Sequence, residues 1–412
     1  MSLFADEAHA STNEATYDFA QKRLDAFLPL AGRVYASQRN HDFGPGAHTK
    51  VSGLSPWLRH RLLLETDVLR DVLSRHGFSA AEKFIQEVFW RGYFKGWLEH
   101  HPEVWKRYRS NLMNQIQALE TDASLARRYE EAVQGNTGID CFDAWAQELT
   151  QTHYLHNHAR MWFASIWIFT LKLPWELGAD FFYRHFLDGD AASNTCSWRW
   201  VGGLHTAGKT YLARPANIED YTQGRFSPAG QLSPDAIPLT EPDLGPRIPL
   251  ALDHPDLAGQ RVGLLVTAED CAPHRVEAMP RPEALFAWTD PVPRSLRPTA
   301  AAVDDFAVQA VTQAADAAQE HFGINCVRPE PGEASADALV NWARQSKLDV
   351  IVTPRMPLGP TRRMVLSTLS KHDLSCVEIT RPYDQAVWPH ARAGFFGLKK
   401  KIPAIIADLG LL

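Results

Sequence analysis

Hydrophobic residues are spaced differently in the two halves of the chain. Between residues 17 and 211, apolar side chains recur three or four positions apart, as in Ala20, Leu24 and Phe27 and again over 84–97. This spacing places them on one face of a helix. The first half is therefore predicted to be an all-helical domain rich in aromatic residues.

From residue 261 onward, short apolar runs alternate with helical stretches. The expected strands are 262–266, 284–288, 324–327, 349–353 and 375–380, and the expected helices cover about 303–321, 335–346 and 360–373. Strands alternating with helices predict a Rossmann-like α/β domain, with a parallel sheet covered on both faces. Universal-stress and electron-transfer-flavoprotein nucleotide folds show the same alternation, and no GxGxxG or P-loop motif decides among them.

A proline-rich segment separates the two patterns. Seven prolines fall between residues 226 and 255, and each lacks an N–H and fixes φ, so no helix continues through this stretch. Its apolar residues are expected to anchor it on one domain: Ile237, Leu239, Ile248 and Leu250. We therefore expect a helical domain over 1–225, a linker over 226–258 and an α/β domain over 259–412.

Composition narrows the class of protein. Of the 412 residues, 45% are hydrophobic and 22% charged, which is ordinary for a globular protein, and the net charge of −6 shows no overall basic excess. The five cysteines are scattered without a CxxC pair, so reduced thiols and no structural metal are expected. No apolar run reaches a membrane span, and the acidic N-terminus does not resemble an export signal. We expect a cytoplasmic protein.

Two predicted helices carry polar residues on a shared face. Glu87 and Arg91 are spaced i and i+4, and Trp90 lies beside them at i+3. Arg160 stands three residues after Asn157, on the same face. Glu87 and Arg91 alone are also typical of a solvated ion pair on a helix surface.

A short loop adds two acidic residues. Asp188 and Asp190 flank one glycine on a largely apolar background. Buried carboxylates without a partner are costly, so they are expected to meet an arginine, with Arg160 and Arg91 as candidates.

Three nearby histidines also suggest a metal site, but their spacing argues against one. His153 and His156 share a helix face and His158 does not, and no carboxylate stands at ligand spacing. No metal is therefore expected.

Taken together, these residues resemble the FAD-binding domain of DNA photolyases and cryptochromes over about residues 17–215. The matching segments are Tyr35–Asn40 with Leu54–Leu58, Phe84–Arg91, Tyr154–Met161 and Asp188–Trp200. The chain departs from the family at Phe84, where a tryptophan is usual, and at Gly53, where an arginine is usual and Lys50 is the nearest replacement.

The resemblance implies bound FAD and a set of residues around it. It places Tyr35, Ser52 and Ser55 near the pyrophosphate, and Glu87, Arg91, Tyr154, Asn157, Asp188 and Asp190 around the flavin and adenosine. Arg160 is expected to pair with Asp188 above the flavin ring, and Asn194 to face the flavin N5. Trp198 and Trp175 correspond to the first two members of the tryptophan chain that photoreduces FAD, and Tyr129 is a candidate for the missing third.

The implied activity is blue-light-driven repair of cyclobutane pyrimidine dimers in DNA, as a deoxyribodipyrimidine photo-lyase. Catalytic roles would fall to Glu87, Asn194, Trp198 and Trp175, and the lesion pocket to Glu87, Trp90, Met161 and Trp200. Arg39 and Arg214 match DNA-phosphate arginines, whereas His158 replaces another. Met161 stands where (6-4) enzymes have a histidine. A cryptochrome-like light sensor or a redox flavoprotein without repair activity remains the alternative.

The α/β half resembles the family's antenna domain, which normally precedes the flavin domain. Here it follows, so the order is permuted. The resemblance leaves open a second, antenna chromophore in this half.

Overall fold

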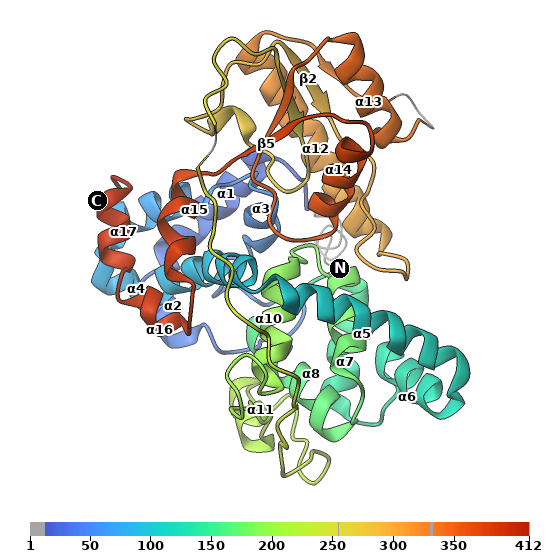
Figure 1. Ribbon diagram of the computed structural model, residues 1–412. Helices are drawn as coiled ribbons and strands as arrows, with labels where there is room; N and C mark the ends of the chain where they lie inside the picture. The colour runs from blue at the N-terminus through green and yellow to red at the C-terminus, as the bar shows by residue number, and fades with distance from the viewer. Residues whose placement is uncertain (1–12, 254, 330–332, 412) are drawn as a thin grey trace, which may run out of the picture.

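The protein is described by a computed structural model that covers residues 13–253, 255–329 and 333–411 (Figure 1). Helices form the first half, and a parallel sheet with its own helices forms most of the second. Within this part of the chain, no helix has the length and apolar content needed to cross a bilayer.

The helical half is built around one long helix, α4 (Glu65–His100). The helices packed around or beside it are α1 (Tyr17–Phe27), α2 (Arg33–Gln38), α3 (Ser55–Arg59), α5 (Pro102–Thr121), α6 (Ala123–Gln134), α7 (Asp140–Thr152), α8 (Asn157–Ser165), α9 (Trp175–His185), α10 (Ala191–Val201) and α11 (Pro215–Tyr221). Glu65 and Asp67 in the first turn of α4 suit the positive end of the helix dipole. Gly77 has φ 69° and ψ 167°, which kinks α4 and leaves its second part, with residues 84–97, at the centre of the domain.

The second half contains a five-stranded, fully parallel sheet in the order β3-β2-β1-β4-β5. Its strands are β1 (Val262–Val266), β2 (Ala284–Ala287), β3 (Cys326–Val327), β4 (Val350–Pro354) and β5 (Cys376–Ile379), and its helices are α12 (Ala301–Phe322), α13 (Ser335–Gln345) and α14 (Pro360–Lys371). All five residues of β1 are buried, as expected for a central strand covered on both faces. The prediction of a parallel sheet is confirmed.

The two faces of the sheet belong to different cores. Leu264 and Val266 lie in the same hydrophobic cluster as the helical half, whereas Leu265 lies in a separate cluster with Phe286 and Trp342. Alternation along β1 therefore joins one face of the sheet to the helical half and leaves the other to its own helices.

The linker lies on the helical half, held by backbone hydrogen bonds and by the side chain of Glu241, which pairs with Arg199 and Arg107. Ile248 donates its N–H to the His100 carbonyl, and its own carbonyl accepts a hydrogen bond from Nδ1 of the His100 imidazole, each at 2.9 Å. Leu239 donates to the carbonyl of Gly202 at 2.9 Å. The predicted side-chain anchoring is confirmed for Leu239 and Leu250, which pack against the hydrophobic core, and is wrong for Ile237 and Ile248, which are 80% and 50% exposed.

After β5 the chain leaves the sheet and returns to the helical half. The helices α15 (Pro382–Val387), α16 (Phe395–Lys399) and α17 (Ile402–Asp408) lie beside α4 and α2 (Figure 1). Asp384 accepts two hydrogen bonds from the buried Arg61 side chain, at 2.7 and 2.8 Å. A Cβ on Gly96 would lie 2.8 Å from the Cα of Trp388, so glycine allows this close approach. Residues 382–411 of the segment assigned to the α/β domain thus pack on the helical one.

Candidate functional site: a cofactor cluster on helix α4

One stripe of α4 carries the polar residues of the site. Glu87, Arg91 and Lys95 are spaced four residues apart, so they follow one another along the same side of the helix. The side chain of Lys95 is only 1% exposed. A buried lysine on an aromatic-rich helix requires an anionic neighbour.

The loop before α10 supplies the anions. Asp188 forms a two-pronged ion pair with Arg160, at 3.0 and 3.2 Å, and the Ser55 hydroxyl is also hydrogen-bonded to it. Asp190 is the N-cap of α10 and accepts from the backbone N–H of Ser193 at 2.7 Å. The chain thus brings together Arg160 and Asp188, the pair expected from the sequence.

Asp190 is also the meeting point of two cations. One of its carboxylate oxygens lies 3.9 Å from Nζ of Lys95 and 4.0 Å from Nε of Arg59. Burial would raise the pKa of Asp190, but Lys95, Arg59 and Arg91 outweigh it and lower the pKa to about 2. Burial also lowers the pKa of Lys95, an effect that Asp190 partly offsets.

Several buried donors in this cluster lack hydrogen-bond partners within the described part of the chain. They are Nε and Nη2 of Arg91, Nζ of Lys95 and the hydroxyl of Ser193. Buried polar groups are nearly always satisfied, so a group of them is typical of a site that binds a polar ligand. A ligand with phosphate and carbonyl acceptors, such as FAD, fits these donors.

The low pKa of Asp190 predicts an acid-sensitive site. Its folded pKa of about 2 lies below the ordinary 3.8, so its stabilising contribution is complete above pH 3.8 and is lost as pH falls toward 2. The difference amounts to about 2 kcal/mol. Urea unfolding at pH 6 and pH 3 should show a smaller acid-induced loss for Asp190→Asn than for wild type. Asp235→Asn, at an exposed position, should match wild type at both pH values; equal acid losses in all three proteins would contradict the assignment.

The remaining predicted cofactor residues have varied environments. Tyr35 is 7% exposed and packs against Phe27 and Phe84. Asn194 donates to the carbonyl of Ala179 at 2.7 Å, which fixes its amide on α10.

Three others lie nearer the edge of the site. The carbonyl of Ser52 accepts a hydrogen bond from Arg23 at 2.9 Å. The Arg160 guanidinium lies 5.6 Å from the ring of Tyr154, a cation–π contact. Asn157 is exposed at the start of α8.

Glu87 and Arg39 form an ion pair with each other. Arg39 was expected to contact DNA phosphate, and Glu87 to lie near the flavin. In this structure the guanidinium of Arg39 is instead engaged by the carboxylate of Glu87.

The three clustered histidines have structural hydrogen bonds. Ring nitrogens of His153, His156 and His158 lie 3.2, 3.0 and 3.0 Å from the backbone carbonyls of His185, Arg39 and Asn40. The described residues contain no group of three or more potential metal ligands.

The tryptophans of the site lie in two aromatic rows. The ring centroid of Trp198 is 6.1 Å from that of Trp167, which is 6.0 Å from that of Tyr129. Trp175 instead has Tyr108 as a ring neighbour, at 5.5 Å. Tyr129 is thus in ring contact with Trp167, a residue that the sequence pattern did not single out.

The residues expected at the lesion pocket are already in contact with other side chains. Trp90 stacks on Phe395, and Trp200 stacks on Tyr211 at 5.6 Å. Met161 is half-buried on α8. Arg214 lies just before α11, and its side chain is exposed.

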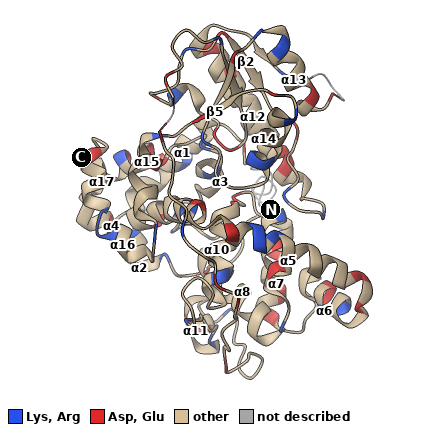
Figure 2. Cartoon of the chain, in the orientation of Figure 1, with Lys and Arg blue, Asp and Glu red and all other residues tan. Residues whose placement is uncertain are grey.

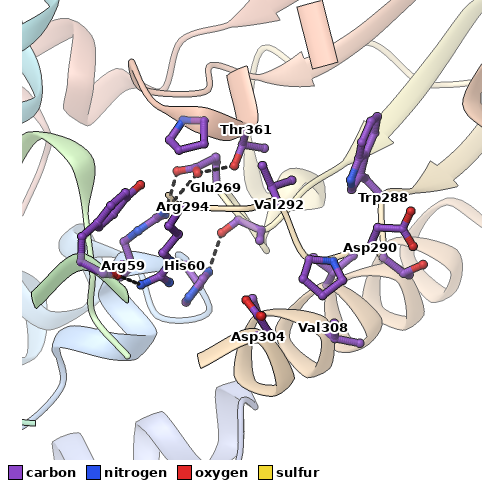
Figure 3. Close-up of a pocket in the computed structure, with 17 residues that line it drawn as sticks. Arg59, His60, Glu269, Trp288, Asp290, Val292, Arg294, Asp304, Val308 and Thr361 are labelled. Atoms are coloured by element: carbon purple, nitrogen blue, oxygen red, sulfur yellow. Dashed lines mark hydrogen bonds and ion pairs between the residues drawn. The ribbon is translucent and has the colours of Figure 1, made fainter. Parts of the chain in front are cut away.

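A small cavity lies between the two halves, outside the carboxyl end of β1 (Figure 3). Arg59 and His60 line it from the helical side, and Glu269, Arg294 and Thr361 from the α/β side. Open α/β sheets bind ligands at this edge. Here the cavity has a volume of about 40 Å³, enough for water and too small for an organic chromophore.

Lys95, Arg59 and Ser193 were not predicted as site residues from the sequence. Lys95 could have been found, because it stands at i+4 from Arg91 and i+8 from Glu87. Arg59 gave no such signal, because its carboxylate partner Glu269 follows 210 residues later in the chain.

The helical scaffold, the paired acidic loop and the unsatisfied buried donors suit a polar cofactor with several acceptor atoms. Residues 84–232 match the FAD-binding domain of DNA photolyase. The chain is 34% identical over 191 residues to a deoxyribodipyrimidine photo-lyase of Thermus thermophilus, covering 46% of this chain and 43% of that protein. It is 26% identical over 213 residues to the one of Escherichia coli, covering 50% and 43%.

Two solved structures are also similar over part of their length. A bacterial class III photolyase from Agrobacterium tumefaciens has 26% identity and a TM-score of 0.42, covering 51% of this chain and 43% of that one. A cryptochrome from Synechocystis sp. PCC6803 has 21% identity and a TM-score of 0.43, covering 50% and 43%. Less than half the length of each of these proteins is therefore matched.

Through its helical half, the chain is similar to the photolyase/cryptochrome family, and the matched FAD-binding domain supports FAD as its cofactor. The residues that would hold FAD are those of the cofactor cluster: Arg91, Lys95, Arg160, Asp188, Asp190 and Ser193.

Proposed function

We propose that this chain repairs cyclobutane pyrimidine dimers in DNA, using FAD and blue light. The observation that carries the proposal is the arrangement on α4, where Glu87 lies one turn before the unsatisfied Arg91 of the cofactor cluster and Trp90 directly precedes it. One helix thereby offers a carboxylate and an aromatic ring to a substrate beside the cofactor. When bound, FAD supplies the light-driven electron.

The substrate roles follow from the chemistry of each side chain. Trp90 and Trp200 offer aromatic faces to an extruded lesion, Glu87 a carboxylate to its polar edge, and Met161 an apolar wall. Arg214 is exposed and can bind a DNA phosphate. Arg39 can do the same if Glu87 releases it and binds the substrate instead.

The cofactor roles fall to a second group. Tyr35, Ser52, Ser55, Tyr154 and Asn157 complete the FAD site around the cofactor cluster. Asn194 faces the flavin, and Trp198 and Trp175 donate electrons for photoreduction.

The two-domain arrangement forms part of the proposal. We assign residues 1–225 to the FAD-binding domain and 259–412 to a Rossmann-like, antenna-like domain, in an order permuted relative to the family. The five cysteines are free thiols, which suits a reducing compartment, and we propose the cytoplasm. DNA is the proposed partner, with no membrane or metal involved.

A light sensor or redox flavoprotein is the second candidate, and two contacts favour it. Phe395 covers a face of Trp90, and Glu87 holds Arg39. In the view of Figure 2, basic and acidic residues are interspersed along both halves, in keeping with the net charge of −6. Few phosphate contacts would then be available.

Repair can be tested directly. Reduced, FAD-loaded protein should convert a dimer-containing single-stranded oligonucleotide to the intact sequence under blue light and not in the dark. Flavin photochemistry without any conversion would instead support the sensor.

Trp200→Ala should then lose lesion preference, because base stacking on an aromatic ring contributes about 1–3 kcal/mol. Arg214→Ala should weaken damaged and plain DNA alike and lower the salt slope on duplex DNA by about 0.9. Binding to both DNAs at two salt concentrations separates the two effects. If Trp200→Ala leaves the lesion preference intact, Trp200 has no stacking role.

A further inference from the structure

The face of Trp90 is covered by a side chain from the other end of the sequence. The rings of Trp90 and Phe395 are stacked with centroids 3.8 Å apart and planes 13° apart. This is the shortest ring separation among the described aromatic pairs. Phe395 is 5% exposed and also meets Tyr93 edge-on at 5.5 Å.

The segment that carries Phe395 is firmly placed on α4. Tyr93 donates a hydrogen bond to the carbonyl of Ala393 at 2.7 Å, two residues before Phe395. Leu398, one turn later, is fully buried. The backbone around Phe395 is therefore held at both ends, while the phenyl ring projects onto the indole.

Phe395 and a nucleobase would use the same surface. Flat rings stack on the face of an indole, and two of them cannot occupy one face together. The adjacent Phe396 is 78% exposed and lies outside this competition. Of these two neighbouring phenylalanines, Phe395 makes the stacking contact with Trp90.

We infer that Phe395 is an internal competitor for the substrate base, which must displace its ring to stack on Trp90. The inference rests on the proposed function, since it assigns Trp90 to a base. It makes Phe395 a specificity-determining residue. Only a base that leaves its own helix at low cost, as a damaged one does, gains from the exchange.

The competition has a measurable size. The free energy of stacking in an aromatic pair is large enough to weaken the binding of a competing base to the same indole face by about two- to tenfold. Removing the phenyl ring should strengthen binding of lesion-containing DNA by that factor. Plain DNA, whose bases stay stacked, should bind as before.

The experiment compares Phe395→Ala with Phe396→Ala in the full-length, FAD-loaded protein. Binding of dimer-containing and plain oligonucleotides is measured by fluorescence anisotropy, with flavin content and melting temperature recorded for each variant. Phe395→Ala should bind the lesion about two- to tenfold more tightly, and Phe396→Ala should match wild type. Phe395→Leu, which keeps apolar volume without a flat ring, repeats the test should the alanine variant fold poorly.

A second readout needs no DNA. Hydroxyl-radical labelling of Trp90, located by peptide mass spectrometry, should rise in Phe395→Ala or Phe395→Leu and stay unchanged in Phe396→Ala. Unchanged labelling, or lesion binding no tighter than wild type in a folded variant, overturns the inference.

Failure of the proposed function has a different signature. In that case Trp90 labelling rises in the Phe395 variants, but neither wild type nor any variant distinguishes damaged from plain DNA. The role of Phe395 as a competitor for a base is then overturned together with the repair activity.

Discussion

Replacement of Trp198 by phenylalanine is expected to slow light-driven reduction of the bound FAD by about tenfold or more, a barrier change of about 1.4 kcal/mol. Trp198 is 2% exposed on α10, four residues after Asn194, and the edge of its ring packs against Gly178 of α9. Phenylalanine retains much of the packing but is a far poorer electron donor. Flavin absorbance followed under blue light with a thiol reductant measures the rate.

The structure adds a comparison between two possible second donors. Trp167 is the ring neighbour of Trp198 and leads to Tyr129, whereas Trp175 leads to Tyr108. Phenylalanine substitutions of Trp167 and Trp175 therefore show which row carries the electron.

The matched control is Trp162→Phe, because Trp162 is equally buried but stacks on Trp145 and His158. It should photoreduce at the wild-type rate. If Trp198→Phe also does so, the donor is another residue or the external reductant.

Much of the α/β half could be predicted from the sequence, because its signals are local. The strand 262–266 is an unbroken apolar run, and the predicted and observed bounds agree. The edge strand β3 was harder to predict. Only Cys326 and Val327 pair with β2, and Ile324 and Asn325, which were expected to begin the strand, lie outside it.

The C-terminal return to α4 could not be predicted in the same way. Its helices have five to seven residues, too short for a clear 3.6-residue period. Their position depends on long-range packing, such as Trp388 against Gly96, which sequence spacing does not reveal. The contact between Trp90 and Phe395 joins residues 305 positions apart and became visible only in the fold.

The same distinction between local and long-range signals applies to the residues of the cofactor site. Glu87, Arg91, Asp188 and Asp190 were predicted because each pair lies within one helix or one loop. Arg59 was not, since it reaches the site from α3 and its carboxylate partner comes from the other half of the chain.

That partner, Glu269, provides the second large expected effect. Arg59 donates to the two carboxylate oxygens of Glu269 at 2.7 and 2.9 Å, and the two side chains are each 6% exposed. Burial would raise the pKa of Glu269, but Arg59 outweighs it and lowers the pKa. Thr361 donates to the same carboxylate at 2.8 Å, so the pair ties α3 to the loop after β1 and to the first turn of α14.

Glu269→Gln should destabilise the protein by about 3–5 kcal/mol at neutral pH, because it leaves a buried guanidinium without its main anionic partner. Arg59 would then have Asp190 as its nearest carboxylate, at 4.0 Å, which draws it toward the cofactor cluster. Urea unfolding, monitored by both flavin release and far-ultraviolet circular dichroism, measures the loss. The variant should also release FAD at lower urea than wild type.

The matched control is Glu283→Gln, whose pair with Arg261 has side chains 45% and 52% exposed. An exposed pair contributes about 0–1 kcal/mol, so this variant should unfold close to wild type. The Glu269 contribution should also fade as pH falls below the ordinary carboxyl pKa, because protonation removes the same charge that the substitution removes. Equal destabilisation by the two substitutions would show that burial of the Arg59–Glu269 pair does not hold the helical and α/β halves together.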